Sequence, residues 1–177
     1  ENGNTSPEID KTYLEGFADT YKDALVDGID SEERALLARA MQLPDVSAII
    51  QMRDNANPVA AYKARQYLLA AIKRTHKPLL QKLYKANEQK GGFSVSSDAM
   101  AQRALRNTAL SILTSTHGTG CAKLAKEHYF NADNMTDRMA ALLAIAANKN
   151  PEREEVLEDF YARYKDYQLV VDKWFSV

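Results

Sequence analysis

The feature that most constrains the fold is a helical spacing of apolar residues that recurs, with short interruptions, along almost the whole chain. Between residues 9 and 26, for example, the apolar side chains are Tyr13, Leu14, Phe17, Tyr21 and Leu25. Intervals of three and four positions place them on one face of an α-helix. Only seven glycines and five prolines occur among 177 residues, which disfavours a turn-rich β-sandwich. The sequence therefore predicts an all-helical protein.

Start and stop signals divide the pattern into about nine helices. Asp30 followed by Glu33, Asp45, Asn57 followed by Pro58, and the serines of 94–97 are typical helix starts. Lys77-Pro78 either starts a helix or kinks the preceding one. The expected helices cover about 9–26, 30–41, 45–52, 57–90, 97–116, 121–130, 135–148, 151–167 and 169–175, and 57–90 counts as two if Lys77-Pro78 starts a helix. In 57–76 the predicted apolar face comprises Val59, Tyr62, Leu68, Ala71 and Ile72.

Short connections make neighbouring helices antiparallel, and nine helices exceed what one four-helix bundle can hold. We therefore expect an irregular α-solenoid of stacked antiparallel helix pairs in a single domain over residues 1–177. Gly91-Gly92 is the clearest loop signal. It indicates either a hinge at 91–92 between two lobes or, as the favoured alternative, a surface loop within one continuous stack.

Charge and composition exclude several classes of partner. Lys and Arg number 23 against 24 Asp and Glu, so no global field attracts nucleic acid or an anionic membrane. The basic residues of the middle segment, which are interleaved with tyrosines, are better interpreted as a solvated helix face than as an RNA site: Lys63, Arg65, Lys73, Arg74, Lys77 and Lys82. No apolar run approaches the ~20 residues of a membrane span. The single cysteine and the lack of a signal peptide favour the cytoplasm.

Few residues are candidates for catalysis or metal binding, and their spacing matches no known catalytic or metal-binding motif. His76, His117 and His128 match no zinc-ligand spacing, and a site assembled from His117 and His128 by folding is the less favoured reading. Cys121 could serve as a thiol nucleophile beside these histidines, but a buried or half-buried structural cysteine is the favoured interpretation. We therefore expect no catalytic residue and no metal ligand in this chain.

One segment, Asn134-Met135-Thr136-Asp137-Arg138, has features that suit binding. Asn134 is a good N-cap, and Asp137 can reach back to the cap amide. The first helical turn presents free N–H groups, and Arg138 on the same turn could hold a carbonyl or carboxylate. The alternative is a plain helix cap with an arginine paired to an acidic residue, which spacing alone favours.

In this segment the sequence resembles the bacterial-type aminopeptidase N family, the zinc gluzincins that remove N-terminal residues from peptides. Three stretches carry the resemblance in the family's order: Leu105-Arg106-Asn107, Asn134–Asp137 with Ala140–Leu142, and Leu169–Phe175. The turns Leu43-Pro44 and Asn57-Pro58 are compatible with it. The resemblance covers the chain from about Ala35 onward. The family's His-Glu-x-x-His and Gly-x-Met-Glu-Asn motifs do not occur here.

The resemblance implies an armadillo- or HEAT-like C-terminal domain that walls the substrate channel of such an enzyme. On this basis Asn134 and Arg138 would contact the peptide beyond the scissile bond. The partners would be the catalytic domain of the same polypeptide and the peptide substrate, and zinc would bind outside this chain. Because the chain starts without methionine and stops after Trp174-Phe175, we expect a truncated piece of a larger aminopeptidase that is inactive alone. A free-standing helical-repeat scaffold for protein–protein binding is the alternative.

Overall fold

The computed structural model describes residues 9–115, 119–147 and 150–177, and these residues form helices without any strand. Their order is α1 (Lys11–Asp23), α2 (Ser31–Ala40), α3 (Val46–Gln51), α4 (Pro58–Ala86), α5 (Ser97–Thr114), α6 (Thr119–Asn131), α7 (Met135–Ala146), α8 (Glu152–Tyr164) and α9 (Gln168–Phe175). The all-helical prediction is confirmed.

Side-chain caps begin most of these helices where the sequence indicated a start. Asp30 Oδ1 accepts from the Glu33 amide at 2.8 Å, and Asp45 Oδ1 accepts from Ala48 at 2.7 Å. Asn57 caps α4 ahead of Pro58, and Ser96 caps α5. Each cap satisfies an N–H group that has no partner within its own helix.

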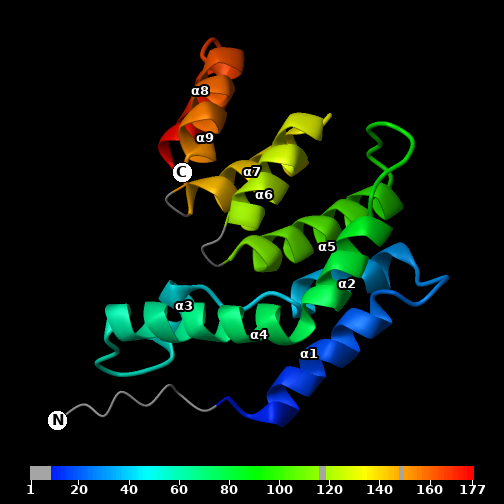
Figure 1. Cartoon of the computed structure of the whole chain (residues 1–177), viewed down its shortest axis with the longest axis vertical. Helices are drawn as coiled ribbons and strands as arrows, with labels where there is room; N and C mark the ends of the chain where they lie inside the picture. Colours follow the sequence, from blue (N-terminus) through cyan, green and yellow to red (C-terminus); the bar gives the residue numbers. More distant parts are fainter. Residues whose placement is uncertain (1–8, 116–118, 148–149) are drawn as a thin grey trace.

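Helix α4 is the longest, with 29 residues, and Pro78 lies inside it rather than at its start. Figure 1 shows α4 bent partway along its length. Proline lacks the N–H that would bond the carbonyl four residues earlier, and its ring displaces that carbonyl. Of the two alternatives, the kink is therefore the one found. The predicted apolar face fails at the first turns of α4, where Val59 and Tyr62 are exposed.

The helices stack from the N-terminal α1–α4 layer to α8 and α9 at the opposite end of the molecule (Figure 1). Helix α5 packs against α2, α4, α6 and α7, and α6 packs against α7 and α8. Helix α9 packs on α8. This succession of neighbouring helix pairs is the expected α-solenoid.

Two clusters of buried side chains form the core, and α5 contributes to both. Leu105 and Ala109 belong to the cluster formed with α1, α2 and α4, whereas Leu110 belongs to the cluster formed with α6, α7 and α8. All three are fully buried. Helix α5 therefore packs against both clusters, which links the two halves of the stack.

The glycine pair lies in the loop between α4 and α5, where Gly92 has φ +75°. Arg103 of α5 is buried beneath this loop. Its Nη1 donates to Gln89 Oε1 at 3.1 Å and to the Ser94 carbonyl at 2.8 Å, and its guanidinium lies 5.2 Å from the Phe93 ring centroid. The loop is thus tied to α5, and a division into lobes at 91–92 stays a prediction.

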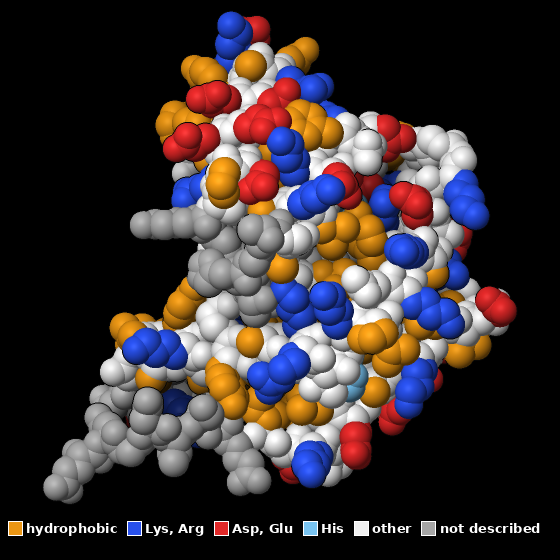
Figure 2. Space-filling view, in the orientation of Figure 1, with side chains coloured by type: hydrophobic (Ala, Val, Ile, Leu, Met, Phe, Trp, Pro, Cys, Tyr) orange, Lys and Arg blue, Asp and Glu red, His pale blue; other side chains and the backbone are white. Residues whose placement is uncertain are grey.

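The surface mixes charges of both signs with scattered apolar side chains (Figure 2). Of the six basic residues predicted to form a solvated helix face, Lys63, Arg74, Lys77 and Lys82 are exposed. Arg65 and Lys73 are half-buried instead, and they donate to the Pro44 carbonyl and to Cys121 Sγ. Leu169 and Phe175 on α9 are also exposed, at 81% and 73%. Among the described helices, none is long and apolar enough to cross a membrane.

Candidate functional site

Asn134 caps helix α7 as the sequence predicts. Its Oδ1 accepts from the Asp137 backbone amide at 2.9 Å, and its Nδ2 donates to Asp133 Oδ1 and Asp137 Oδ2, each at 2.9 Å. The side chain is buried. The carboxylate of Asp137 therefore meets the side-chain amide of the cap residue. In this geometry Asn134 fixes the turn that presents the first N–H groups of α7.

Asp137 connects this turn to helix α5. Its carboxylate is buried, and Oδ1 accepts from Asn107 Nδ2 at 2.8 Å. A buried carboxylate is tolerated only when its oxygens accept hydrogen bonds, and Asp137 receives them from Asn107 and Asn134. The cap of α7 is therefore held from the neighbouring layer of the stack.

Arg138 is half-buried and is held from three sides. Its Nη1 donates to the Tyr164 hydroxyl and its Nη2 to the Ala132 carbonyl, while its guanidinium lies 5.8 Å from the Tyr129 ring centroid. The guanidinium thus binds a hydroxyl and a carbonyl, whereas the plain structural alternative expected pairing with an acidic residue. A guanidinium carries five N–H donors, so these two contacts orient the group without using all of its donors.

A buried histidine lies beside the same cap. His128 Nδ1 is 2.8 Å from the Tyr84 hydroxyl, and His128 Nε2 is 4.0 Å from Asp137 Oδ1. Burial, reinforced by the positive charge of Arg106, lowers the pKa of His128 from 6.5 to about 4, against the opposing effect of Asp137 and Glu88. The ring is therefore neutral at physiological pH and has a structural place in the core.

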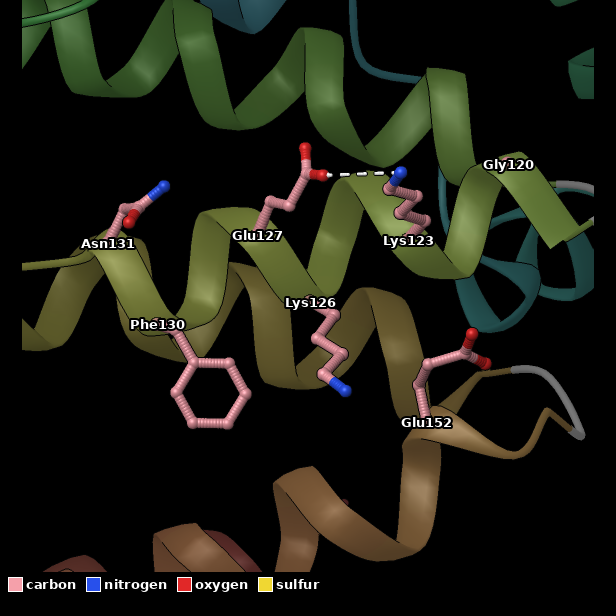
Figure 3. A pocket seen from close by; sticks show the side chains of 7 residues that line it. All are labelled: Gly120, Lys123, Lys126, Glu127, Phe130, Asn131 and Glu152. Carbon is pink, nitrogen blue, oxygen red and sulfur yellow. Dashed lines mark ion pairs between the residues drawn. The ribbon is translucent and has the colours of Figure 1, made fainter.

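An open hollow of about 610 Å³ follows the outer face of α6 (Figure 3). Its lining residues come from α6 and from the start of α8: Gly120, Lys123, Lys126, Glu127, Phe130, Asn131 and Glu152. Figure 3 shows Lys126 and Phe130 projecting from the side of α6 where Glu152 lies, with Lys123 and Glu127 on the other side. The hollow reaches the end of α6, three residues before Asn134.

The cysteine and the histidines do not form a reaction centre in the part of the chain that the structure covers. Cys121 is half-buried, with its Sγ 2.9 Å from Lys73 Nζ, as expected for a structural cysteine. His76 Nε2 lies 2.8 Å from the Leu14 carbonyl. His117 lies outside the described residues, so its pairing with His128 stays open. No three potential metal ligands lie close together among the described residues.

Sequence reasoning selected Asn134 and Arg138 but missed the residues that hold them. Asn107 of α5 donates to Asp137 of the cap, and Tyr164 of α8 accepts from Arg138, while Tyr84 of α4 contacts His128 beside the cap. Asn107 stands in the stretch Leu105–Asn107, which was one of the matching stretches, and that stretch was the available signal. Contact of Asn134 and Arg138 with a peptide stays a prediction.

Comparison with known proteins places these features in context. A family model described as "Domain of unknown function (DUF3458_C) ARM repeats" matches residues 5–177. An aminopeptidase N of Caulobacter vibrioides is 34% identical over 169 residues, which cover 95% of this chain and 19% of that protein. An aminopeptidase N of Escherichia coli is 30% identical over 158 residues, which cover 89% of this chain and 18% of that protein.

The fold also occurs in a solved structure. Legionella pneumophila aminopeptidase A, in complex with aspartic acid, superimposes with a TM-score of 0.80 at 19% identity and covers 98% of this chain. The match takes up 21% of that aminopeptidase. The chain thus spans about a fifth of the length of the curated relatives and of this structure, and the structural likeness shows the shared helical fold.

Proposed function

Since this chain belongs to the DUF3458_C family of armadillo-repeat domains, we propose that it is the non-catalytic C-terminal domain of an aminopeptidase N that removes N-terminal residues from peptides. Two relatives named aminopeptidase N align with most of the chain, and it corresponds to less than a fifth of each. Two facts together carry the proposal. The similarity covers most of the chain, and the sequence contains neither His-Glu-x-x-His nor Gly-x-Met-Glu-Asn, the two catalytic motifs of the family.

The proposed role is to wall the substrate channel and to contact the peptide beyond the scissile bond. Arg138 supports this role because its guanidinium is oriented by Tyr164 and Ala132 yet retains donors for a carbonyl or carboxylate oxygen. Asn134 contributes by fixing the first turn of α7, whose N–H groups and helix dipole favour the same oxygens. Both groups bind and orient, and neither takes part in bond cleavage.

The zinc ion expected for such an enzyme would be bound by the catalytic domain of the same polypeptide. The described residues of this chain do not fit it, since they bring no three potential ligands together. No catalytic step is therefore assigned to this chain. Its partners would be that catalytic domain and the peptide substrate, in the cytoplasm.

Hydrolysis of alanine p-nitroanilide tests whether the catalytic site lies outside this chain. The 177-residue chain with added zinc should be inactive, and mixing it with the separately produced catalytic part should change the selectivity for peptides. Zinc-dependent hydrolysis by the chain alone would contradict the proposal, because it would require a site within this chain.

Substitution of Arg138 tests the contact with the peptide. In the full-length enzyme, Arg138→Ala should raise KM for peptides more than for the anilide, because the anilide has no residue beyond the first to reach Arg138. Arg163→Ala is a matched control, since Arg163 is more exposed and pairs with Asp159 on the same helix. Equal effects of Arg138→Ala on both substrates would count against a downstream contact.

A free-standing scaffold that binds a partner protein is the second candidate. The exposed Leu169 and Phe175 on α9 favour it, because exposed apolar side chains on one helix suit a protein interface. A stable complex of the 177-residue chain with another polypeptide, formed through α9 and indifferent to peptides, would favour the scaffold over the aminopeptidase domain.

A further inference from the structure

The buried ring of His128 makes a hydrogen bond on one side only. Its Nδ1 lies 2.8 Å from the Tyr84 hydroxyl, whereas its Nε2 has no hydrogen-bond partner among the described residues. The His128 side chain is 1% exposed, so bulk solvent does not reach the ring. A buried polar atom without a partner costs free energy, and folded proteins seldom keep one. The second nitrogen therefore calls for a partner other than the side chains around it.

The carboxylate of Asp137 faces this nitrogen but lies too far from it for a direct hydrogen bond. The distance from His128 Nε2 to Asp137 Oδ1 is 4.0 Å, whereas a hydrogen bond between nitrogen and oxygen spans about 2.7–3.2 Å. A water molecule at about 2.8 Å from both atoms would join them with an angle of about 90° at its oxygen. The spacing of the two groups thus suits one bridging water.

A further buried acceptor belongs to the same cluster. Asn107 Nδ2 donates to Asp137 Oδ1 at 2.8 Å, and Asn107 Oδ1 on the same amide is buried without a partner in the described part of the chain. A carboxylate can only accept, which fixes this orientation of the amide. A water that accepts from His128 has two hydrogens left for these two oxygens. Buried waters typically make about three hydrogen bonds, and the cluster offers three.

The direction of the hydrogen bonds follows from Tyr84. Burial raises the pKa of Tyr84, although the positive charge of Arg106 and a hydrogen bond from its guanidinium oppose the rise. The guanidinium, 4.8 Å from the Tyr84 ring centroid, can only donate. The hydroxyl oxygen therefore accepts from Arg106 and gives its own proton to His128 Nδ1. A neutral imidazole that accepts at Nδ1 carries its hydrogen at Nε2, which the negative charge of Asp137 also favours.

We infer that one internal water molecule binds between His128 Nε2 and Asp137 Oδ1, and that His128 is held there as the Nε2–H tautomer. The water completes a directed chain of hydrogen bonds from α5 to the cap of α7, in the order Arg106, Tyr84, His128, water, Asp137 and Asn134. Because the chain includes side chains of α4 and α6, it positions the first turn of α7 from three neighbouring helices. The inference does not depend on the proposed function.

Nuclear magnetic resonance of the 177-residue chain, labelled with ¹⁵N, tests the tautomer at pH 7. Long-range correlations between the ring nitrogens and the carbon-bound ring protons identify the protonated nitrogen without relying on its exchange with solvent. His76 supplies the reference for a protonated nitrogen, since its Nε2 lies 2.8 Å from the Leu14 carbonyl, which can only accept. Nε2 of His128 should resonate in the same range, and Nδ1 far downfield of it. The opposite tautomer, or a rapid mixture of both, would overturn the inference.

Cross-relaxation with water in the same sample tests the bound molecule. The ring proton Hε1 of His128 and its Nε2–H should give nuclear Overhauser cross-peaks to water, with the sign of a long-lived complex. Such peaks are expected because the ring is shielded from bulk solvent. Their absence would overturn the water bridge.

Three variants separate the water from other exchangeable protons. Tyr84→Phe removes a hydroxyl that could relay magnetisation from solvent to the ring, and the cross-peaks of His128 should persist. Asp137→Glu lengthens the carboxylate by one methylene group, so that it reaches Nε2 directly, displaces the water and abolishes the cross-peaks. Asp133→Glu is the matched control, because it lengthens an exposed carboxylate on the same turn, and it should keep them.

Loss of the cross-peaks in Tyr84→Phe would assign them to the hydroxyl and overturn the water bridge. Their persistence in Asp137→Glu would overturn it as well, because the bridging position would then not lie between the two groups. Far-UV circular dichroism verifies the helical fold of each variant. The spectra of the unsubstituted chain decide the inference even if one variant does not fold.

Discussion

Burial of His128 predicts that the protein loses stability in mildly acidic solution. The residue is 4% exposed, and its burial, with Arg106 nearby, lowers its pKa from 6.5 to about 4. The unfolded chain therefore binds a proton that the folded chain excludes. In the window between pH 6.5 and about 4, the free energy of unfolding rises with pH. The contribution is complete above pH 6.5 and is lost as the pH falls through this window.

The expected size follows from the two pKa values. Each unit of difference corresponds to about 1.4 kcal/mol, and between pH 7 and pH 5 the partial titration of the unfolded chain gives a loss of about 2 kcal/mol. Stopping at pH 5 keeps most carboxylates ionised. The change is therefore assigned to His128 over a range in which few other groups titrate.

Urea unfolding at several pH values from 5 to 7, followed by far-UV circular dichroism, measures this slope. His128→Gln removes the titrating ring, so the variant should lose most of the pH dependence even if it is less stable at pH 7. The two proteins are compared by the slope of the free energy of unfolding against pH. Loss of the contact with Tyr84 lowers the stability of the variant at every pH and does not change this slope. Equal slopes in the two proteins would refute the reasoning from burial.

Three further predictions use thermal or urea unfolding of paired variants. Gly92→Ala should destabilise the protein by about 1 kcal/mol, because Gly92 has φ +75°, which is strained for alanine. Gly91→Ala should be neutral or slightly stabilising. Equal effects of the two substitutions would contradict the argument from the φ angle of Gly92. Asn134→Ala should lower the free energy of unfolding by about 1–2 kcal/mol through loss of the α7 cap, and an unchanged midpoint would show that the cap contributes nothing. Leu142→Ala should destabilise the protein by about 2–5 kcal/mol, and Leu143→Ala by under about 0.5 kcal/mol. The reason is that the Leu142 side chain is 0% exposed and the Leu143 side chain 52%. Similar losses for the two variants would refute the assignment of the buried and exposed faces of α7.

The sequence is sufficient to predict a structural feature when that feature depends on residues close together in the chain. The caps at Asp30, Asp45 and Asn134 each involve an acceptor and an amide three residues apart. Such a contact forms whenever the helix forms, whatever the rest of the molecule does. The position of Asn134 at the start of α7 was predictable for this reason.

Contacts between helices were not predictable in the same way. Asn107 reaches Asp137 across 30 residues, and Tyr84 reaches His128 across 44. Whether such side chains meet depends on how the helices cross, and apolar periodicity does not specify the crossing. The network around the α7 cap thus became visible only in the folded chain.

The exposed start of α4 shows a different limit. Val59 and Tyr62 continue an apolar spacing that correctly predicts the helix, yet both are exposed. Helix α4 has 29 residues and α5 only 18, so α4 extends past the helix against which it packs most. Periodicity indicates which face could be buried, but a neighbour must be present to bury it.

The position of α5 between the two buried clusters has a consequence for how the protein unfolds. In a string of independent repeats, one end can melt while the other stays ordered. Here, separation of α6–α8 from the stack would expose Leu110, and separation of α1–α4 would expose Leu105 on the same helix. Either partial state would leave a fully buried leucine of α5 in water. The shared helix therefore couples the two ends, so that they unfold together as one cooperative unit.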